Sequence, residues 1–215
     1  MKLNKIEFSF VNSRIRAYFQ DKFELKEIRR LSTLSSDKLV LEIGCGNGGG
    51  ARLIKKYFSP LKIYAIDFDQ RMIDIAKDNN TDESIIFELG DACNLRFKDG
   101  QFDAVFDFGV IHHIPNWEDC IKELKRVLKI GGELIIEDYS IETFETTTGK
   151  ILRKLTNHPY ERMYKRNELI ECLKRSGFEI MKEKIYHPLH LIKYFTIIAK
   201  RIDGPGSGMR VDPSF

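Results

Sequence analysis

The chain has 215 residues, of which 42% are hydrophobic and 31% are charged, and its formal net charge is +3. A chain of this length and composition buries one hydrophobic core, so a single domain is expected. It has no signal-peptide core and no run of about 20 apolar residues, so neither a leader nor a membrane span is expected. The four cysteines lie far apart without a CxxC pair. This spacing excludes a zinc knuckle or a disulfide framework and favours a reducing cytoplasm.

Charge is distributed unevenly along the chain. Residues 150–201 contain 13 Lys and Arg against five Asp and Glu, whereas the remainder is acidic. The basic excess either forms solvated helix faces or attracts an anionic partner, such as an acidic substrate, nucleic acid or a membrane surface.

The N-terminal residues predict a helical cap. Residues 8–34 alternate apolar and charged positions at roughly helical spacing, which predicts one or two amphipathic helices. Residues 1–36 are therefore assigned to a cap, which covers either the functional site or only the edge of the sheet. The run Ser35-Ser36-Asp37 ends it.

A strand, a glycine-rich turn and a helix follow. The apolar strand that begins at residue 39 runs into Gly44-Cys45-Gly46-Asn47-Gly48-Gly49, and a helix is predicted over residues 51–58. Glycines in such a turn let the backbone bend sharply and approach a nucleotide-like ligand closely. Glu42 puts a carboxylate at the end of the strand, where burial makes a cationic or donor-rich partner necessary.

The next two predicted strands are each associated with an acid. Asp67 ends the second strand, 23 residues after Gly44, and a carboxylate at that offset can accept two hydrogen bonds from a ribose diol. The alternative role, capping the following helix, suits Asp69 better. Asp91 follows the third strand at the edge where parallel sheets bind ligands, and it suits an adenine amino group.

Strands and helices then alternate along the chain. This βαβ pattern predicts an α/β fold with a parallel sheet and helices on both faces. Because the link at residues 187–190 is too short for a parallel crossover, the last strand is expected to run antiparallel. Gly131-Gly132 is expected to end the helix predicted over residues 116–128. Strands are predicted over residues 62–67, 85–89, 102–109, 133–139, 179–186 and 191–200, and helices over residues 70–79, 116–128 and 167–175.

Residues 141–164 interrupt this alternation. They are polar and rich in threonine, with a weak helical stripe that Asn157-His158-Pro159-Tyr160 breaks. We interpret them as a lid inserted in a main domain of residues 37–202. Residues 203–215, with three glycines and two prolines, predict a flexible tail.

Six motifs in order resemble those of the class I S-adenosylmethionine-dependent methyltransferases. Within that class they resemble the small-molecule enzymes of the ubiquinone/menaquinone-biosynthesis-like type (methyltransferase type 11). The resemblance covers residues 40–138 closely and the two terminal strands more loosely. The motifs are VLEIGCGNG (residues 40–48), IDFDQRMI (66–73), GDA (90–92), FDAVF (102–106), IHHIP (111–115) and LKIGG (128–132).

The resemblance implies a Rossmann-like fold with a seven-stranded, mostly parallel sheet, helices on both faces and an antiparallel last strand. It also implies that S-adenosylmethionine binds across the carboxyl edges of the first strands. The implied contacts are Glu42, Gly44, Cys45 and Gly46 for the methionine end, Asp67 for the ribose, and Phe68, Met72, Asp91 and Ala92 for the adenine.

Catalysis in such an enzyme is in-line transfer of the sulfonium methyl group, helped by alignment and desolvation of the reactants. His112 or His113 is a candidate general base, because histidine titrates near neutral pH. A structural hydrogen bond is the alternative role for either ring. Asp107 and Asp138, at nearby strand ends, are the other polar candidates, and no metal site is predicted.

The acceptor is expected to be a small molecule, and the basic last third of the chain favours an anionic one. Asp107-Phe108-Gly109-Val110 replaces the Asn/Asp-Pro-Pro-aromatic signature of enzymes that methylate exocyclic amino groups, which disfavours adenine and glutamine as substrates. Nucleic acid is not expected as a partner. Three alternatives stay open: an RNA or protein methyltransferase, a non-catalytic S-adenosylmethionine-binding subunit, and an NAD-dependent dehydrogenase. The dehydrogenase is considered because Gly44, Gly46 and Gly49 also satisfy GxGxxG. The acceptor atom and the oligomeric state cannot be read from the sequence.

Overall fold

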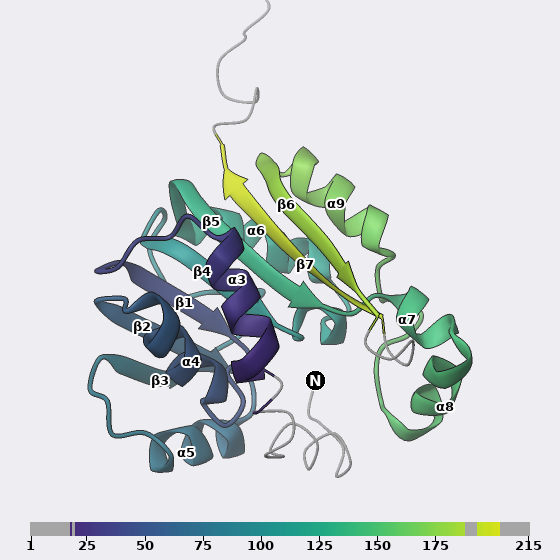
Figure 1. The fold of residues 1–215 in the computed structure, drawn as a ribbon, viewed down its shortest axis with the longest axis horizontal. Coiled ribbons are helices and arrows are strands. Elements are labelled where there is room, and N and C mark those ends of the chain that lie inside the picture. Colours follow the sequence, from purple (N-terminus) through teal and green to yellow (C-terminus); the bar gives the residue numbers. More distant parts are fainter. Residues whose placement is uncertain (1–17, 19, 188–192, 203–215) are drawn as a thin grey trace, which may run out of the picture.

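The computed structural model describes residue 18, residues 20–187 and residues 193–202. In this part of the chain, seven strands form one sheet in the order β3-β2-β1-β4-β5-β7-β6 (Figure 1). The strands are β1 (Leu39–Ile43), β2 (Lys62–Asp67), β3 (Ile85–Leu89), β4 (Phe102–Phe108), β5 (Leu128–Asp138), β6 (Phe178–Tyr186) and β7 (Tyr194–Arg201). The helices are η1 (Gln20–Glu24), α3 (Leu25–Leu31), α4 (Gly49–Phe58), α5 (Gln70–Asp78), η2 (Ile111–His113), α6 (Trp117–Val127), α7 (Ile141–Glu145), α8 (Thr147–Leu155) and α9 (Arg166–Arg175).

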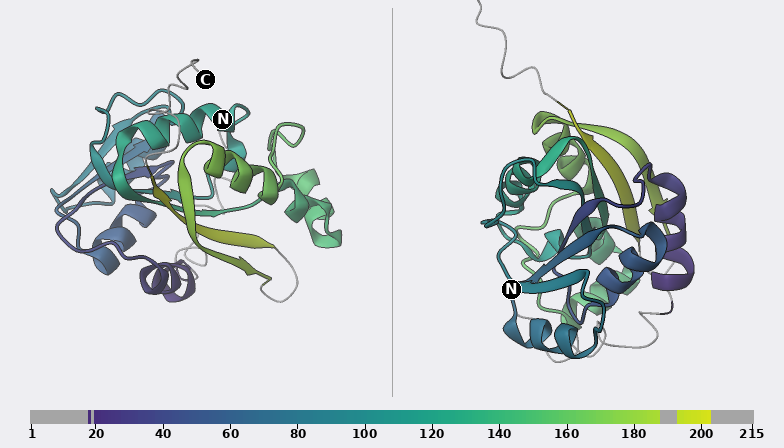
Figure 2. Two further views of the ribbon diagram at one scale, coloured as in Figure 1. Left: turned by 90° about the horizontal axis from the view of Figure 1, so that it is seen from above. Right: turned by 90° about the vertical axis from the view of Figure 1, so that its left-hand side faces the viewer.

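Helices cover both faces of the sheet because successive side chains along each strand point to opposite faces. In β1, Val40 belongs to the core shared with α3, α4 and α5, whereas Leu41 belongs to the core shared with α6 and α9. Figure 2 shows α3 and α4 on one side of the sheet and α6 and α9 on the other. Strands buried on both faces read as nearly continuous apolar runs, which is why the sequence showed them so clearly.

The strands from β1 to β5 run parallel, and β7 runs antiparallel to both of its neighbours. This confirms the predicted mostly parallel seven-stranded sheet with a reversed last strand. Parallel pairing brings the carboxyl ends of β1, β2, β3 and β4 to one edge, so the loops that follow these strands lie close together.

The predicted boundary between α6 and β5 is wrong. The helix was expected to continue to Leu128 and end at Gly131-Gly132, but α6 ends at Val127 and Leu128 already pairs with Phe102 in the sheet. The register then shifts before Ala104 pairs with Glu133. Gly131, with φ +77°, lets the chain bulge out at this point, so the two glycines form an irregularity inside a strand and do not end a helix.

Only part of the predicted N-terminal cap can be compared with the structure. Residues 1–17 lie outside the described residues, while η1 and α3 confirm helical structure from Gln20 to Leu31. The chain leaves α3 through Ser32 and Thr33, which donate hydrogen bonds to the buried carboxylate of Glu133 on β5. This contact holds α3 against the sheet.

Two short helices, α7 and α8, occupy the segment predicted to be a lid, and Figure 1 shows them projecting beyond the end of the sheet. The side chain of Thr146 accepts a hydrogen bond from the Gly149 amide and so begins α8. The lid role stays a prediction. The predicted tail, residues 203–215, and the predicted start of the last strand at residue 191 lie outside the described residues. No helix that the structure describes is both long and apolar enough to cross a bilayer.

Leu124→Ala tests the core between α6 and the sheet. Leu124 is fully buried, so removing its side chain leaves a cavity and should lower the free energy of unfolding by about 2–5 kcal/mol. Leu61→Ala is the matched control, because Leu61 is 66% exposed, and it should change stability by less than about 0.5 kcal/mol. Urea unfolding followed by circular dichroism measures both, and equal losses would contradict this packing.

Candidate functional site

A cavity of about 330 Å³ lies at the carboxyl edge of the sheet. Its walls come from the turn after β1, from the end of β2 with the start of α5, and from the loops after β3 and β4. The lining residues are Gly44, Gly46, Ile66, Asp67, Phe68, Asp69, Met72, Gly90, Asp91, Ala92, Cys93, Phe108, Gly109, Val110, His113, Ile114, Pro115 and Asn116.

The glycine turn packs closely against the loop after β4. Gly44 has φ +59°, and a Cβ atom at this position would lie 2.1 Å from Cγ2 of Val110. A side chain is therefore excluded both by the backbone conformation and by the neighbouring chain. Val110 also lines the cavity, so this contact sets the distance between two of its walls.

Glu42 lies beneath the turn and does not line the cavity. Its carboxyl group is 2% exposed, and its Oε1 lies where a Cβ on Gly50 would be, at the start of α4. Oε2 has no hydrogen-bond partner among the residues that the structure describes. Burial, and then the nearby charge of Asp67, raise the pKa of Glu42 well above its usual range, while Arg52 and the amide of Ala51 act in the opposite direction.

Asp67 connects the turn to the start of α5. Its Oδ2 accepts a hydrogen bond from the Gly46 amide at 2.9 Å, and its Oδ1 accepts one from the Asp69 amide at 2.9 Å. These bonds lower the pKa of Asp67, but burial outweighs them and raises it above the usual range. Each oxygen keeps a second lone pair, so the carboxyl can accept further hydrogen bonds from a diol in the cavity.

The far wall of the cavity offers apolar surface and one more acid. The Phe68 side chain is 58% exposed and Met72 is 2% exposed, and both line the cavity. Asp91 accepts a hydrogen bond from the Cys93 amide at 2.9 Å, and the buried Ala92 lies between them. A flat ring between these side chains would contact both apolar and polar groups.

Besides Glu42, two further predicted site residues do not line the cavity. The thiol of Cys45 packs in the core on the α4 side of the sheet and does not line the cavity. Asp107 is fully buried, and its Oδ1 accepts hydrogen bonds from the amides of Val110 and Ile111, so it shapes the loop after β4. Burial, and then the charge of Asp138, raise the pKa of Asp107 well above its usual range. Their roles in binding and catalysis stay predictions.

Asp138, at the end of β5, is the centre of a buried hydrogen-bond network. Its Oδ1 contacts Nδ1 of His112, and its Oδ2 accepts from the His112 amide at 3.0 Å and from the Tyr164 hydroxyl at 2.6 Å. The His112 side chain is itself buried and does not line the cavity. Asp138 therefore fixes the orientation of the His112 ring and links it to the chain that follows α8.

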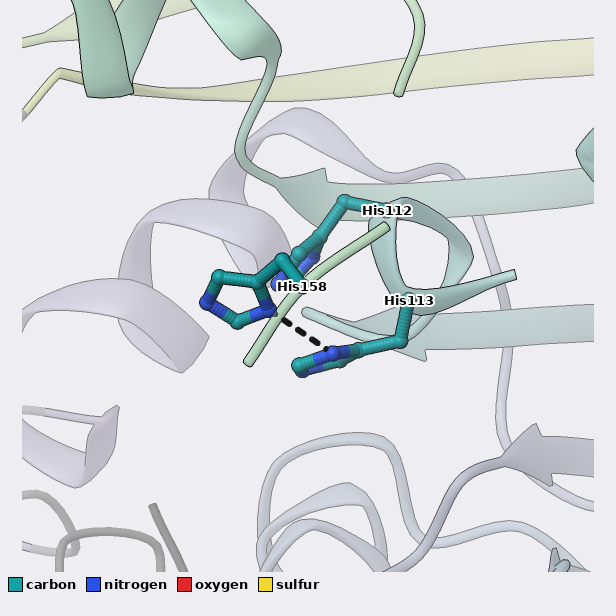
Figure 3. Close-up of side chains that lie close together, drawn as sticks. All are labelled: His112, His113 and His158. Atoms are coloured by element: carbon teal, nitrogen blue, oxygen red, sulfur yellow. Dashed lines mark hydrogen bonds between the residues drawn. The ribbon is translucent and has the colours of Figure 1, made fainter. Parts of the chain in front are cut away.

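His113, unlike His112, lines the cavity. Its Nδ1 lies 2.9 Å from Nδ1 of His158, and its ring centroid is 4.0 Å from that of His112 (Figure 3). Burial lowers the pKa of His113 well below its usual range and that of His158 to about 3, so both rings are neutral at pH 7. In the sequence, His158 is recognisable only as part of a run that breaks a helix, because nothing in the sequence pairs it with a residue 45 positions away.

Comparisons with known proteins agree with this geometry. Residues 41–136 match the family profile of a methyltransferase domain. Phosphoethanolamine N-methyltransferase 2 of Caenorhabditis elegans is 33% identical over 118 residues, which are 54% of this chain and 27% of that protein. Fatty-acid O-methyltransferase of Mycolicibacterium smegmatis is 35% identical over 101 residues, which are 47% of this chain and 37% of that protein. The chain thus spans about a third of the length of these curated relatives.

A solved structure of a SAM-dependent methyltransferase from Aquifex aeolicus shares the fold, with a TM-score of 0.73 at 19% identity over 94% of this chain and 100% of that chain. Residues 41–136 therefore match a methyltransferase domain and have the fold of S-adenosylmethionine-dependent methyltransferases, and S-adenosylmethionine is the cofactor that this likeness implies.

The residues around the cavity fit this cofactor. S-adenosylmethionine carries a sulfonium and an ammonium group. The charge of the half-buried Asp67 raises the pKa of the buried Glu42, so a positively charged ligand beside these two acids is favoured. Its ribose offers a diol to Asp67. A dinucleotide would instead bring an anionic pyrophosphate next to two acids, so the charge of the site disfavours NAD.

Gly44→Ala tests the contact between the turn and Val110. The variant should lose at least about tenfold in affinity for S-adenosylmethionine, because Val110 must move into the cavity. Gly100→Ala is the matched control, since Gly100 has a similar φ of +60° but its Cβ would lie 4.0 Å from the nearest atom. Both variants should lose about 1–2 kcal/mol of stability from the left-handed backbone. Calorimetry should find lower affinity only in Gly44→Ala, and an equal affinity in both variants would contradict the expected effect.

Proposed function

We propose that this protein transfers the methyl group of S-adenosylmethionine to a small-molecule acceptor at the cavity beside the glycine turn. The observation that carries the proposal is the cavity itself, in which the turn at Gly44 and the carboxyl of Asp67 meet above the buried Glu42. The bound cofactor would supply an electrophilic methyl group on a positively charged sulfur. The chain's own residues have to bind the cofactor, align the acceptor and keep water out.

Alignment and desolvation are the main contributions that this site can make. In-line transfer requires the acceptor atom to approach the methyl group from the side opposite the sulfur, with no water between them. The loop after β4 forms the wall where an acceptor would enter, and its apolar members Phe108, Val110 and Ile114 line the cavity. The segment containing α7 and α8 would act as the lid, since its residue His158 contacts His113 on that loop.

His113 is the best-placed candidate for a general base. It lines the cavity, and Nε2, which does not contact His158, can accept a proton from the acceptor in the tautomer that is protonated on Nδ1. His112 and Asp107 would act as positioning residues, because both are buried behind the cavity wall and hold the loop after β4. Such a base is needed only if the acceptor is a hydroxyl, a thiol or an acidic carbon.

A small anionic acceptor is supported by two observations. The two relatives are named for phosphoethanolamine and for a fatty acid, one methylated at nitrogen and the other at oxygen, and both compounds carry an anionic group. In this chain Lys150, Arg153 and Lys154 lie on α8, next to the loop that carries His158. Because the relatives differ in the atom that is methylated, the acceptor atom is left open. The four free cysteines are compatible with the cytoplasmic location, which stays a prediction.

Asp67→Ala tests the ribose contact. The variant should bind S-adenosylmethionine about 10- to 100-fold more weakly, because a charged hydrogen-bonding partner of the diol is lost. Asp74→Ala is the control, since Asp74 is an exposed acid on the neighbouring helix α5 and does not line the cavity. Calorimetry measures both variants, and an unchanged dissociation constant in folded Asp67→Ala would rule out the ribose role.

The reaction itself is tested by product detection. The protein, S-adenosylmethionine with a labelled methyl group and a cell extract are incubated, and labelled products are separated into small molecules, protein and RNA before mass spectrometry. Labelled small molecules are expected, and their formation should fall at least about tenfold with Asp67→Ala at subsaturating cofactor. Label found only in RNA or protein would favour that alternative, and no label with intact cofactor binding would favour a non-catalytic subunit.

A further inference from the structure

We propose that His112, His113 and His158 form a binding site for a divalent transition-metal ion of the Zn²⁺ type. These three residues are brought together from η2 and from the loop after α8, and each offers a ring nitrogen within 4.8 Å of the others (Figure 3). Neutral imidazole is a preferred ligand of Zn²⁺, Co²⁺, Ni²⁺ and Cu²⁺, whereas Mg²⁺ and Ca²⁺ prefer oxygen. Three histidines without a fourth protein ligand are a known arrangement for zinc sites that keep one open position.

The hydrogen bond between His112 and Asp138 is the first support for this assignment. Because Asp138 contacts Nδ1 of His112 as a hydrogen-bond acceptor, this nitrogen carries a proton and Nε2 is left to bind an ion. A carboxylate that orients a histidine in this way is the usual outer partner of a metal-bound imidazole. The Tyr164 hydroxyl, at 2.6 Å from the other oxygen of Asp138, holds the carboxylate in turn.

The spacing of the rings is the second support. Two nitrogens bound to one tetrahedral Zn²⁺ lie about 3.3 Å apart, since each Zn–N bond is about 2.0–2.1 Å long. The Nδ1 atoms of His113 and His158 lie 2.9 Å apart, and their rings are tilted by 45°. Binding of the ion by both Nδ1 atoms would replace the hydrogen bond between them. The ring that donates this bond would then carry its proton on Nε2 instead of Nδ1. It would also require His113 to turn from its stacked position over His112, where the rings are tilted by 35°.

The location of the cluster gives the ion a function. His113 lines the cofactor cavity, so the open coordination position would face the space from which an acceptor approaches. A hydroxyl, thiol or amine bound there would have a lowered pKa and would be oriented for attack. With the ion bound, this lowered pKa takes the place of the general-base role of His113. This use of the ion depends on the proposed methyl transfer, whereas ion binding itself does not.

Metal binding is tested first on the chain as it is, without cofactor or acceptor. The protein is stripped with a chelator, and Zn²⁺ affinity is measured by competition with a chromophoric chelator. Co²⁺, which takes the same ligands, reports tetrahedral coordination by its visible absorption. We expect one ion per chain at micromolar or lower dissociation constant and no competition from Mg²⁺. Failure to bind stoichiometric Zn²⁺, or a strong near-ultraviolet charge-transfer band showing Co²⁺ bound to cysteine thiolate, would overturn the proposal.

A pair of histidine variants then locates the ion. His158→Gln should lower Zn²⁺ affinity by more than about 100-fold, because loss of a ligand costs more than loss of an outer partner. His187→Gln is the matched control, since His187 is exposed at the end of β6 and outside the cluster, and it should bind Zn²⁺ as the parent does. The affinity for S-adenosylmethionine is measured on the same samples to show that both variants are folded. It should be unchanged in His158→Gln and in His187→Gln. Equal Zn²⁺ affinity in the two variants would overturn the site, while loss of cofactor binding by the parent chain would instead contradict the proposed function.

Discussion

The packing of Gly44 against Val110 is the contact on which the site depends. It joins the turn after β1 to the loop after β4, the two segments that follow neighbouring strands in the middle of the sheet. Parallel pairing forces both segments to the same edge, and only a residue without a Cβ allows them to meet so closely. The cavity exists because these two segments are held at this distance while α5 and the loop after β3 close its other sides.

Charge explains why this cavity suits one kind of ligand. Glu42 is buried, Asp67 is half-buried, and the charge of Asp67 disfavours the charged form of Glu42. A ligand with positive charge relieves this repulsion, whereas an anionic pyrophosphate increases it. The glycine spacing is compatible with S-adenosylmethionine and with NAD, and the acids around the turn favour S-adenosylmethionine.

A second network organises the acceptor side. Asp138 accepts hydrogen bonds from His112 and Tyr164, and His158 contacts His113. In this way the loop after β4 is connected to the segment that carries α7 and α8. Any movement of that segment would therefore change the surroundings of His113.

The sequence by itself determined the strands, their parallel order and the acids at their ends, because apolar runs and offsets such as that between Gly44 and Asp67 are local properties. It also determined the glycine turn. The tertiary structure alone decided that Leu128 pairs in the sheet, because the bulge at Gly131 depends on pairing with β4. It also decided that the Cys45 thiol faces the core. It alone brought His158 to His113, since a contact across 45 residues depends on how the segment after β5 folds back over the sheet edge.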